Sequence, residues 1–188
     1  MNTTAPMPSL ECESLRYPIM TVLMHPAELA PETLLADCRV TRTRRSGPGG
    51  QHRNKVETAV VLEHLPTGLR AEAGERRSQA DNRRVALQRL RLRLALEYRC
   101  QRVGAGPSAR WLARIRQGRL AISAAHDDYP AVVAEALDHL APAGGDLRPV
   151  AEALHVTPTQ LANLFRREPA AWQRLASLRA EHGRPPLK

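Results

Sequence analysis

The sequence predicts an α+β fold, in which a short mixed sheet and one long helix precede an all-helical C-terminal part. Residues 38–44 alternate as C-R-V-T-R-T-R, and residues 59–65 and 69–73 have the apolar, β-branched composition of strands. From residue 78 to about 102 the chain has no Gly or Pro and is rich in Leu, Ala, Arg and Gln, which indicates a helix. Beyond residue 124, helix-capping residues recur at helical spacing.

The strands and the long helix are bounded by local signals. Pro66-Thr67-Gly68 predicts the turn of a hairpin between the second and third strands. Ser78-Gln79-Ala80-Asp81 is a capping-box pattern at the start of the helix. Four apolar side chains then fall on one helical face: Leu87, Leu90, Leu94 and Tyr98.

Four segments are expected along the chain. Residues 1–37 lack sustained periodicity and form an N-terminal arm, in which Pro26 and Pro31 limit residues 18–36 to short helical turns. Residues 38–102 form the α+β domain. Residues 103–123 are a linker followed by a basic helix at about 109–120, and residues 124–188 form a helical accessory domain.

The accessory domain contains two helices with the proportions of a helix-turn-helix. Asp146 caps the first, and Thr157-Pro158 caps the second. Four residues of the second helix could contact bases or phosphate: Thr159, Gln160, Asn163 and Arg166. A small bundle that packs or binds protein is the favoured alternative, because the segment carries little net charge.

Charge is distributed unevenly within a net charge of +9. Residues 39–102 hold sixteen Arg and Lys against six Asp and Glu, whereas residues 1–38 hold one Arg and five acids. A positive block of this kind favours a polyanionic partner, although a solvated Arg-rich surface is the alternative. Three scattered cysteines indicate neither a zinc site nor a disulfide framework. Without a long apolar segment, we expect a cytoplasmic protein that does not enter membranes, and a monomer.

The most informative segment is the loop that contains Gly49-Gly50-Gln51. Three glycines in four positions let the backbone approach another surface closely, because no Cβ intervenes. Arg44, Arg45, Arg53 and Lys55 surround this backbone with positive charge suited to phosphates. The segment holds no acid, Cys or Ser–His pair at its tip, so catalysis by it would rely on positioning and on N–H donors for attacking water. A partner would have to supply the rest of the site.

This region resembles the catalytic domain of class I peptide-chain release factors and their codon-independent ribosome-rescue relatives. The resemblance spans roughly residues 38–97, about a third of the chain, with motifs in the same order and spacing. Its matching residues are Ser46-Gly47-Pro48-Gly49-Gly50-Gln51-His52, then 54–60, Pro66-Thr67-Gly68, Arg77-Ser78-Gln79, Asn82, Ala86 and Leu90. Arg53 departs from the pattern, since the family has a small apolar residue after the histidine.

The resemblance implies a function on the ribosome. Gly49, Gly50 and Gln51 would enter the peptidyl-transferase centre, where the Gln51 N–H stabilises the transition state of peptidyl-tRNA hydrolysis. Gln51 would also be a candidate for N5-methylation by a glutamine methyltransferase. The expected ribosomal RNA contacts are Arg44, Arg45, His52, Arg53, Asn54, Lys55, Arg76 and Arg77. No metal or organic cofactor is implied.

Two features bear on the choice among release factors. A full release factor has a codon-reading domain before the catalytic one, and only 37 residues precede the matching segment here. We therefore expect codon-independent release of nascent chains from stalled ribosomes, as in rescue factors, although their basic tail is replaced by a mildly basic helical region. The alternatives are a non-catalytic nucleic-acid-binding regulator that uses the C-terminal helices, and an inhibitor that occupies the ribosomal A site without hydrolysis.

Overall fold

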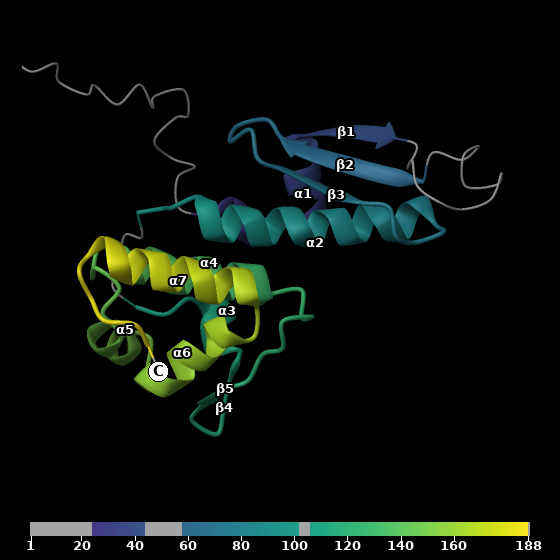
Figure 1. Ribbon diagram of the computed structural model, residues 1–188. Helices are drawn as coiled ribbons and strands as arrows, with labels where there is room; N and C mark the ends of the chain where they lie inside the picture. The colour runs from purple at the N-terminus through teal and green to yellow at the C-terminus, as the bar shows by residue number, and fades with distance from the viewer. Residues whose placement is uncertain (1–23, 44–57, 102–105, 188) are drawn as a thin grey trace, which may run out of the picture.

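The computed structural model describes residues 24–43, 58–101 and 106–187, and it confirms the α+β class. The long helix α2 (Gln79–Glu97) separates two layers, with a three-stranded sheet on one side and the C-terminal helices on the other (Figure 1). One core of buried aliphatic side chains runs through both layers. Within the described residues, no helix is long and apolar enough to cross a membrane.

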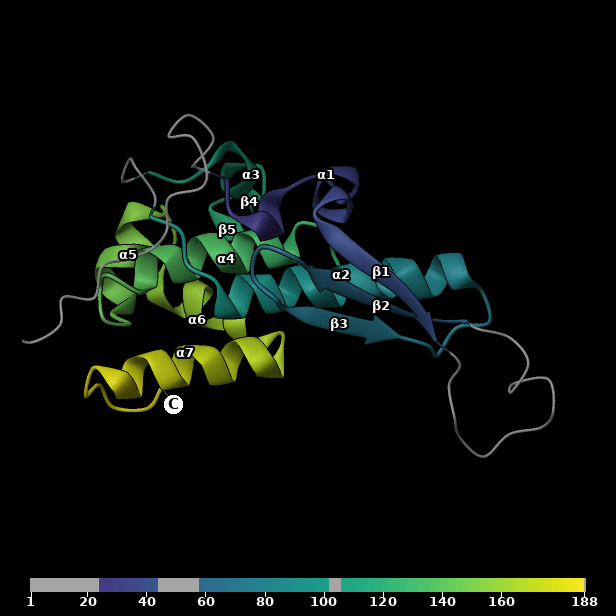
Figure 2. The same cartoon turned by 90° about the horizontal axis from the view of Figure 1, so that it is seen from above.

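The sheet is built from β1 (Cys38–Thr43), β2 (Ala59–His64) and β3 (Arg70–Ala73), in that spatial order (Figure 2). Both strand pairs are antiparallel, so the sheet is not mixed as the sequence had suggested. The short connection between β2 and β3, residues 65–69, permits antiparallel pairing, whereas a parallel pair needs a long crossover. The central strand β2 is largely buried, and β1 is an exposed edge.

The predicted hairpin turn between β2 and β3 is confirmed. The N–H of His64 donates to the carbonyl of Leu69 at 2.8 Å, and the N–H of Gly68 donates to the carbonyl of His64 at 2.8 Å. Gly68 has a φ of +69°, a conformation that costs glycine little. The ring of His64, which is 2% exposed, lies 2.8 Å from the hydroxyl of Thr67. The turn is therefore closed by both backbone and side-chain hydrogen bonds.

Helix α2 begins where the capping pattern predicts and ends earlier than expected. The Ser78 hydroxyl accepts from the N–H of Asp81 at 3.3 Å, while Leu90 and Leu94 on its inner face are fully buried. The helix stops at Glu97, five residues before the expected end, and Tyr98 is extended. The following backbone is held instead by helix α4 (Tyr129–Leu140), because the N–H of Cys100 donates to the Asp138 carboxylate at 3.1 Å. This stop depends on a tertiary contact.

Residues before the sheet also join the core. They form the 3-10 helix η1 (Pro26–Glu28) and the short helix α1 (Pro31–Ala36), in keeping with the helical turns expected there. Ala27 is fully buried between α2 and α4, and the ring of His25 lies 3.1 Å from the carbonyl of Tyr98. The structure thus packs the described part of the N-terminal segment, from His25 onward, with the domain that was expected to begin at residue 38.

The prediction of a basic helix at about residues 109–120 is wrong. After one helical turn the chain forms a tight hairpin, in which Gln117 and Gly118 have φ values of 49° and 70°. Two consecutive left-handed residues are typical of a two-residue hairpin turn and cannot continue a helix. Trp111 is fully buried and donates from its indole N–H to the carbonyl of Leu154 at 2.9 Å, which holds this turn against the C-terminal helices. The elements here are α3 (Ala109–Leu112), β4 (Ile115–Arg116) and β5 (Arg119–Leu120).

The last part of the chain is helical, as predicted. Asp146 and Thr157 accept hydrogen bonds at the starts of their helices, so both predicted caps are confirmed. The central helix of this part is buried on nearly every side, and the Tyr129 hydroxyl at its start donates to the carbonyl of Leu164 at 2.9 Å. The four helices are α4 (Tyr129–Leu140), α5 (Leu147–Ala153), α6 (Pro158–Arg166) and α7 (Pro169–Glu181).

Candidate functional site

The loop predicted to carry catalysis joins two strands whose ends lie side by side. Thr43, the last residue of β1, is paired with Ala59, the first residue of β2. The connecting residues 44–57 lie outside the described part of the chain. They contain Gly49, Gly50 and Gln51 and most of the predicted RNA contacts, namely Arg44, Arg45, His52, Arg53, Asn54 and Lys55. What the structure provides is the frame that holds both ends of this loop.

Asn82 ties the exit of the loop to the start of α2. Its side chain is fully buried and donates from Nδ2 to the carbonyls of Thr58 at 2.6 Å and Arg76 at 2.9 Å. Its Oδ1 accepts from the N–H of Arg76 at 2.9 Å. One amide thus pairs three backbone groups from two segments that are distant in sequence. The sequence pattern had included Asn82 without assigning it this role, because its partners become neighbours only after folding.

Four exposed arginines gather at the same end of the sheet, and we call them the tip arginines. Arg42 is paired through β2 with the end of β3, which leads directly into Arg76, Arg77 and, one helical turn into α2, Arg83. Within the described residues, their guanidinium groups make no hydrogen bond or ion pair. Of the predicted RNA contacts, Arg76 and Arg77 are therefore placed on the surface with their positive charge available to a partner.

The neighbouring arginines of the sheet differ, because acids neutralise them. Glu63 forms ion pairs with Arg70 at 2.8 Å and with Arg39 at 3.3 Å. The hydrogen bond from Arg70, followed by the charges of both arginines, lowers the pKa of Glu63. Glu75 pairs with Arg89 at 2.6 Å, and backbone N–H donors at Gly74 and Glu75 contribute most to the lowering of its pKa. Among the described residues of the sheet layer and α2, positive charge without a protein partner is thus concentrated at the end of the sheet that carries the loop.

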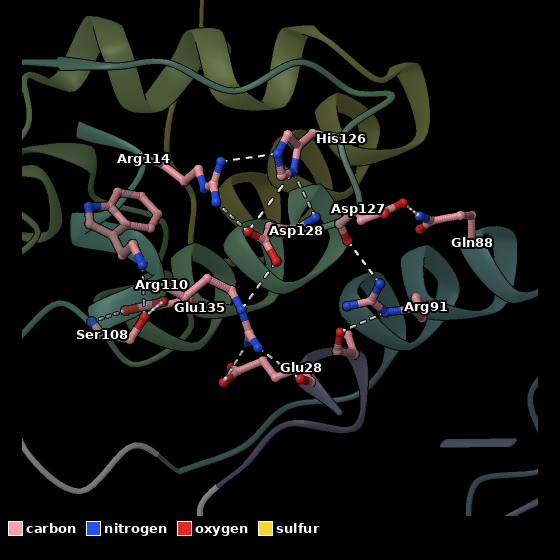
Figure 3. A network of polar contacts seen from close by, with 12 residues as sticks. Glu28, Gln88, Arg91, Ser108, Arg110, Arg114, His126, Asp127, Asp128 and Glu135 are labelled. Carbon is pink, nitrogen blue, oxygen red and sulfur yellow. Dashed lines mark hydrogen bonds and ion pairs between the residues drawn. The ribbon is translucent and has the colours of Figure 1, made fainter. Parts of the chain in front are cut away.

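A network of polar contacts connects the sheet layer to the C-terminal helices, and we call it the joint (Figure 3). Arg110 of α3 donates to the carbonyl of Glu28 at 3.0 Å and lies 3.4 Å from the carboxylate of Asp128. Arg114 approaches the same carboxylate at 3.0 Å, and its guanidinium lies 3.0 Å from the ring of His126. One carboxylate at the start of α4 therefore holds two guanidinium groups.

Arg91 extends the joint into α2. Its side chain is 6% exposed and donates to the carbonyls of Ala27 at 3.1 Å and Asp127 at 2.9 Å. Burial, followed by the charge of Arg110, lowers the pKa of Arg91. Since α2 also packs against β2 and β3, these bonds link the frame of the loop to α4. The joint is a structural device that sets the position of the tip relative to the C-terminal helices.

The helix-turn-helix interpretation requires one correction. Thr159, Asn163 and Arg166 are exposed on α6, as that interpretation needs. Gln160 is not available, because its Nε2 donates to the carbonyl of Gly118 at 3.2 Å and its Oε1 accepts from the N–H of Leu120 at 3.4 Å. Gln160 therefore fastens the β4–β5 hairpin to α6. Periodicity had placed it on the outer face, but the hairpin that covers it was not expected.

No metal centre emerges from the residues that the structure describes, in which no three His, Cys, Asp or Glu side chains converge. The thiol of Cys38 donates to the carbonyl of Leu34 at 3.1 Å. Burial, followed by the charge of Asp37, raises the pKa of this thiol to about 11. At neutral pH it is therefore protonated and is a poor nucleophile.

Comparison with known proteins finds a match that covers the sheet, α2, α3 and the β4–β5 hairpin. Residues 32–121 match the model of the RF-1 domain. Peptide chain release factor 1 of Delftia acidovorans is 45% identical over 84 residues, which are 44% of this chain and 23% of that protein. The mitochondrial peptide chain release factor 1 of Bos taurus is 45% identical over 73 residues, or 39% of this chain and 16% of that protein.

A third relative, the mitochondrial peptide chain release factor 1-like protein of Rattus norvegicus, is 41% identical over 75 residues, which are 40% of this chain and 20% of that protein. The matched segment thus spans about a fifth of the length of these relatives. The family match ends at residue 121, so α4 to α7 lie outside it.

Proposed function

Because residues 32–121 form an RF-1 domain, the catalytic domain of the class I release factor family, we propose that this chain hydrolyses peptidyl-tRNA on the ribosome. The observation that carries the proposal is the tripeptide Gly49-Gly50-Gln51 in the loop that joins the paired strand ends Thr43 and Ala59 of that domain. The loop would insert into the peptidyl-transferase centre, and the tip arginines would contact large-subunit RNA beside it.

The chemistry follows from what this loop offers. The Gln51 N–H is a neutral donor that can stabilise the oxyanion formed when water attacks the ester between peptide and tRNA. The Gln51 side chain would exclude larger nucleophiles by occupying the space beside that water. Gly49 and Gly50 allow the backbone to reach the ester without steric hindrance from a Cβ. Ribosomal RNA and the tRNA itself supply the remaining contacts.

The RNA contacts that we propose around the tip are Arg44, Arg45, His52, Arg53, Asn54, Lys55, Arg76 and Arg77. The exposed, unneutralised state of the last two supports this assignment. Gln51 is also proposed as the site of N5-methylation by a glutamine methyltransferase. Mass spectrometry of the tryptic peptide that contains Gln51, purified from native cells, would test this by the mass of one methyl substitution.

We further propose that release does not require a stop codon. The identity to release factor 1 lies within the RF-1 domain, while the helices α4 to α7, which lie outside that match, are on the side of α2 opposite the sheet (Figure 1). Nascent chains on stalled ribosomes are the corresponding substrate. Domain boundaries near residues 103 and 124 remain part of this proposal, with the joint fixing the domains to each other, whereas the residues from His25 onward pack with the sheet domain.

The experiment is a release assay with matched variants. Ribosomes that carry labelled peptidyl-tRNA on an mRNA without a stop codon are incubated with the protein, and released peptide is counted. We expect Gln51→Ala to lower the rate by about 10²–10³-fold, and Gly50→Ala to lower it strongly. Gln173→Ala, on the exposed side of α7, and Gly106→Ala, where a Cβ would meet open space, should release peptide at the native rate.

Other results would favour the alternatives. Equal release with and without a stop codon supports codon independence, whereas release that requires the stop codon contradicts it. Tight ribosome binding without release, in native protein and in Gln51→Ala alike, indicates an A-site inhibitor. Binding to DNA without affinity for ribosomes indicates a regulator and overturns the proposal.

A further inference from the structure

The β4–β5 hairpin, which lies at the end of the RF-1 match, and α6, which lies outside that match, enclose a shallow groove. Its hollow has a volume of about 190 Å³, and it is lined by Arg119 and Ile122 on the hairpin side and by Asn163 and Arg167 on the helix side. Gln160 joins the two sides through its hydrogen bonds to the hairpin backbone. The groove is therefore a fixed feature of the packing, and we call it the hairpin groove.

Two arginines line the hairpin groove, Arg119 and Arg167, and a third, Arg116, is paired with Arg119 in the hairpin beside it; all three lack protein partners among the described residues. Arg116 and Arg119 are exposed on the hairpin, and Arg167 is exposed at the end of α6. In the described ranges of the chain, the guanidinium groups of all three form neither an ion pair nor a hydrogen bond. The groove lining contains no acid, and Glu168, the acid next to Arg167, is half-buried outside it.

Apart from Arg148, the other arginines that the structure describes in the C-terminal half have protein partners. Arg110 and Arg114 share Asp128, Arg174 pairs with Glu181 at 3.1 Å, and Arg184 pairs with Asp146 at 3.2 Å. Three neighbouring arginines left without acids produce a local positive potential that attracts a polyanion. The arginines at the hairpin groove and the tip arginines thus share one property, which is exposed positive charge without an acidic partner among the described residues.

We infer that the hairpin groove binds the phosphate backbone of RNA, as a second contact separate from the tip. Arginine donates to phosphate in a planar, bidentate geometry, and Nδ2 of Asn163, whose Oδ1 accepts from Arg166 at 3.3 Å, adds a neutral donor within the groove. The apolar lining residues Leu120, Ile122 and Leu164 are 9%, 6% and 1% exposed, so the groove offers little of the apolar anchoring surface that a peptide would need.

The position of the groove indicates that this RNA differs from the RNA at the tip. The sheet lies on one side of α2, and the hairpin with α6 lies on the other (Figure 1). The assignment of the groove to a second segment of RNA rests on the proposed function, because a ribosome presents RNA to both faces of a bound factor. The groove would strengthen ribosome binding without taking part in hydrolysis.

Binding to RNA alone tests the groove without requiring hydrolysis. A fluorescein-labelled RNA hairpin is titrated with the full chain, and polarisation is measured from 50 to 200 mM KCl. Arg119→Gln is compared with Arg148→Gln, which removes the same charge from another exposed arginine without a partner in the described structure. We expect Arg119→Gln to weaken binding roughly fivefold at 0.1 M salt and to reduce the slope of log K against log salt by about 0.7–0.9.

Further variants make the result decisive. Arg119→Gln combined with Arg167→Gln should about double the loss in slope, while Arg148→Gln stays near the native value. Arg116→Gln provides an independent variant if either of the others melts at a lower temperature. Equal binding by Arg119→Gln and Arg148→Gln overturns the inference, as does displacement of RNA by poly-glutamate at equal charge concentration.

The release assay separates this inference from the proposed function. If native protein releases no peptide while Arg119→Gln still weakens RNA binding, the proposed function fails and the groove stands. If release is normal and Arg119→Gln binds RNA as Arg148→Gln does, the groove alone fails. When both hold, Arg119→Gln should require more ribosomes for half-maximal release and show an unchanged rate at saturation.

Discussion

The arginines of the joint and those of the tip are the same residue type in opposite states. At the joint, Arg91 is 6% exposed and bonded to two carbonyls, and Arg110 and Arg114 share the carboxylate of Asp128. At the tip, Arg77 and Arg83 extend into solvent and contact no acid among the described residues. The first group stabilises the protein, and the second is left for a partner. Net charge alone does not distinguish them.

The largest effect is expected from Arg91→Met. This change keeps much of the apolar volume but leaves two carbonyls without their donor, so the free energy of unfolding should fall by about 3 kcal/mol. Arg83→Met, in the same helix and exposed, is the matched control and should change it by less than about 0.5 kcal/mol. Urea denaturation followed by circular dichroism measures both. An equal decrease in the free energy of unfolding of the two variants would show that the joint arginine Arg91 stabilises the fold no more than the tip arginine Arg83 does.

Asn82→Ala should have the next largest effect. The change removes three hydrogen bonds at a fully buried site and should lower the free energy of unfolding by about 2 kcal/mol. Because it frees the exit of the loop at Thr58, it should also slow peptide release at saturating protein. Asp81→Ala, one residue earlier and half-exposed, is the control. A variant that is destabilised but releases peptide at the native rate would show that Asn82 does not position the loop.

Asp128→Asn is expected to have a smaller effect. Its carboxylate is 25% exposed, and its partners Arg110 and Arg114 are 31% and 24% exposed, so water screens these pairs in part. The free energy of unfolding should fall by about 1 kcal/mol, and the loss should diminish at high salt. Glu63→Gln, whose partners are 64% and 65% exposed, should cost less than Asp128→Asn. The opposite order would contradict the proposed role of the joint.

The smallest effect concerns pH and the buried ring of His64. Burial lowers its pKa from the ordinary value of 6.5, with Asp37 opposing the shift. The unfolded chain then binds a proton at His64 more readily than the folded chain does. The free energy of unfolding is therefore highest above pH 6.5, where the ring is neutral in both states, and it decreases as the pH falls below 6.5. Denaturation at pH 7.5 and pH 5 should show a smaller difference for His64→Gln than for native protein. An unchanged difference would exclude His64 as the titrating group.

Local signals predicted much of the fold. The β2–β3 hairpin follows from Pro66-Thr67-Gly68, and the start of α2 from the Ser78 cap, because each is decided by residues close in sequence. The helix expected at residues 109–120 failed because one tight turn at Gln117 and Gly118 outweighs the helical composition around it. Gln160 was misassigned because the hairpin that covers it comes from a segment about forty residues earlier.

The sequence by itself determined the three strands of the sheet, the helix caps, the excess of arginine and the tripeptide Gly49-Gly50-Gln51, since all of these are read from neighbouring residues. The tertiary structure decided which arginines keep an available charge. That outcome depends on contacts such as those of Arg110 with Glu28 and of Arg91 with Ala27, whose partners are 82 and 64 residues apart. Electrostatic neutralisation depends on distance in space, and only the packing of α2 between the sheet and α4 brings these groups together.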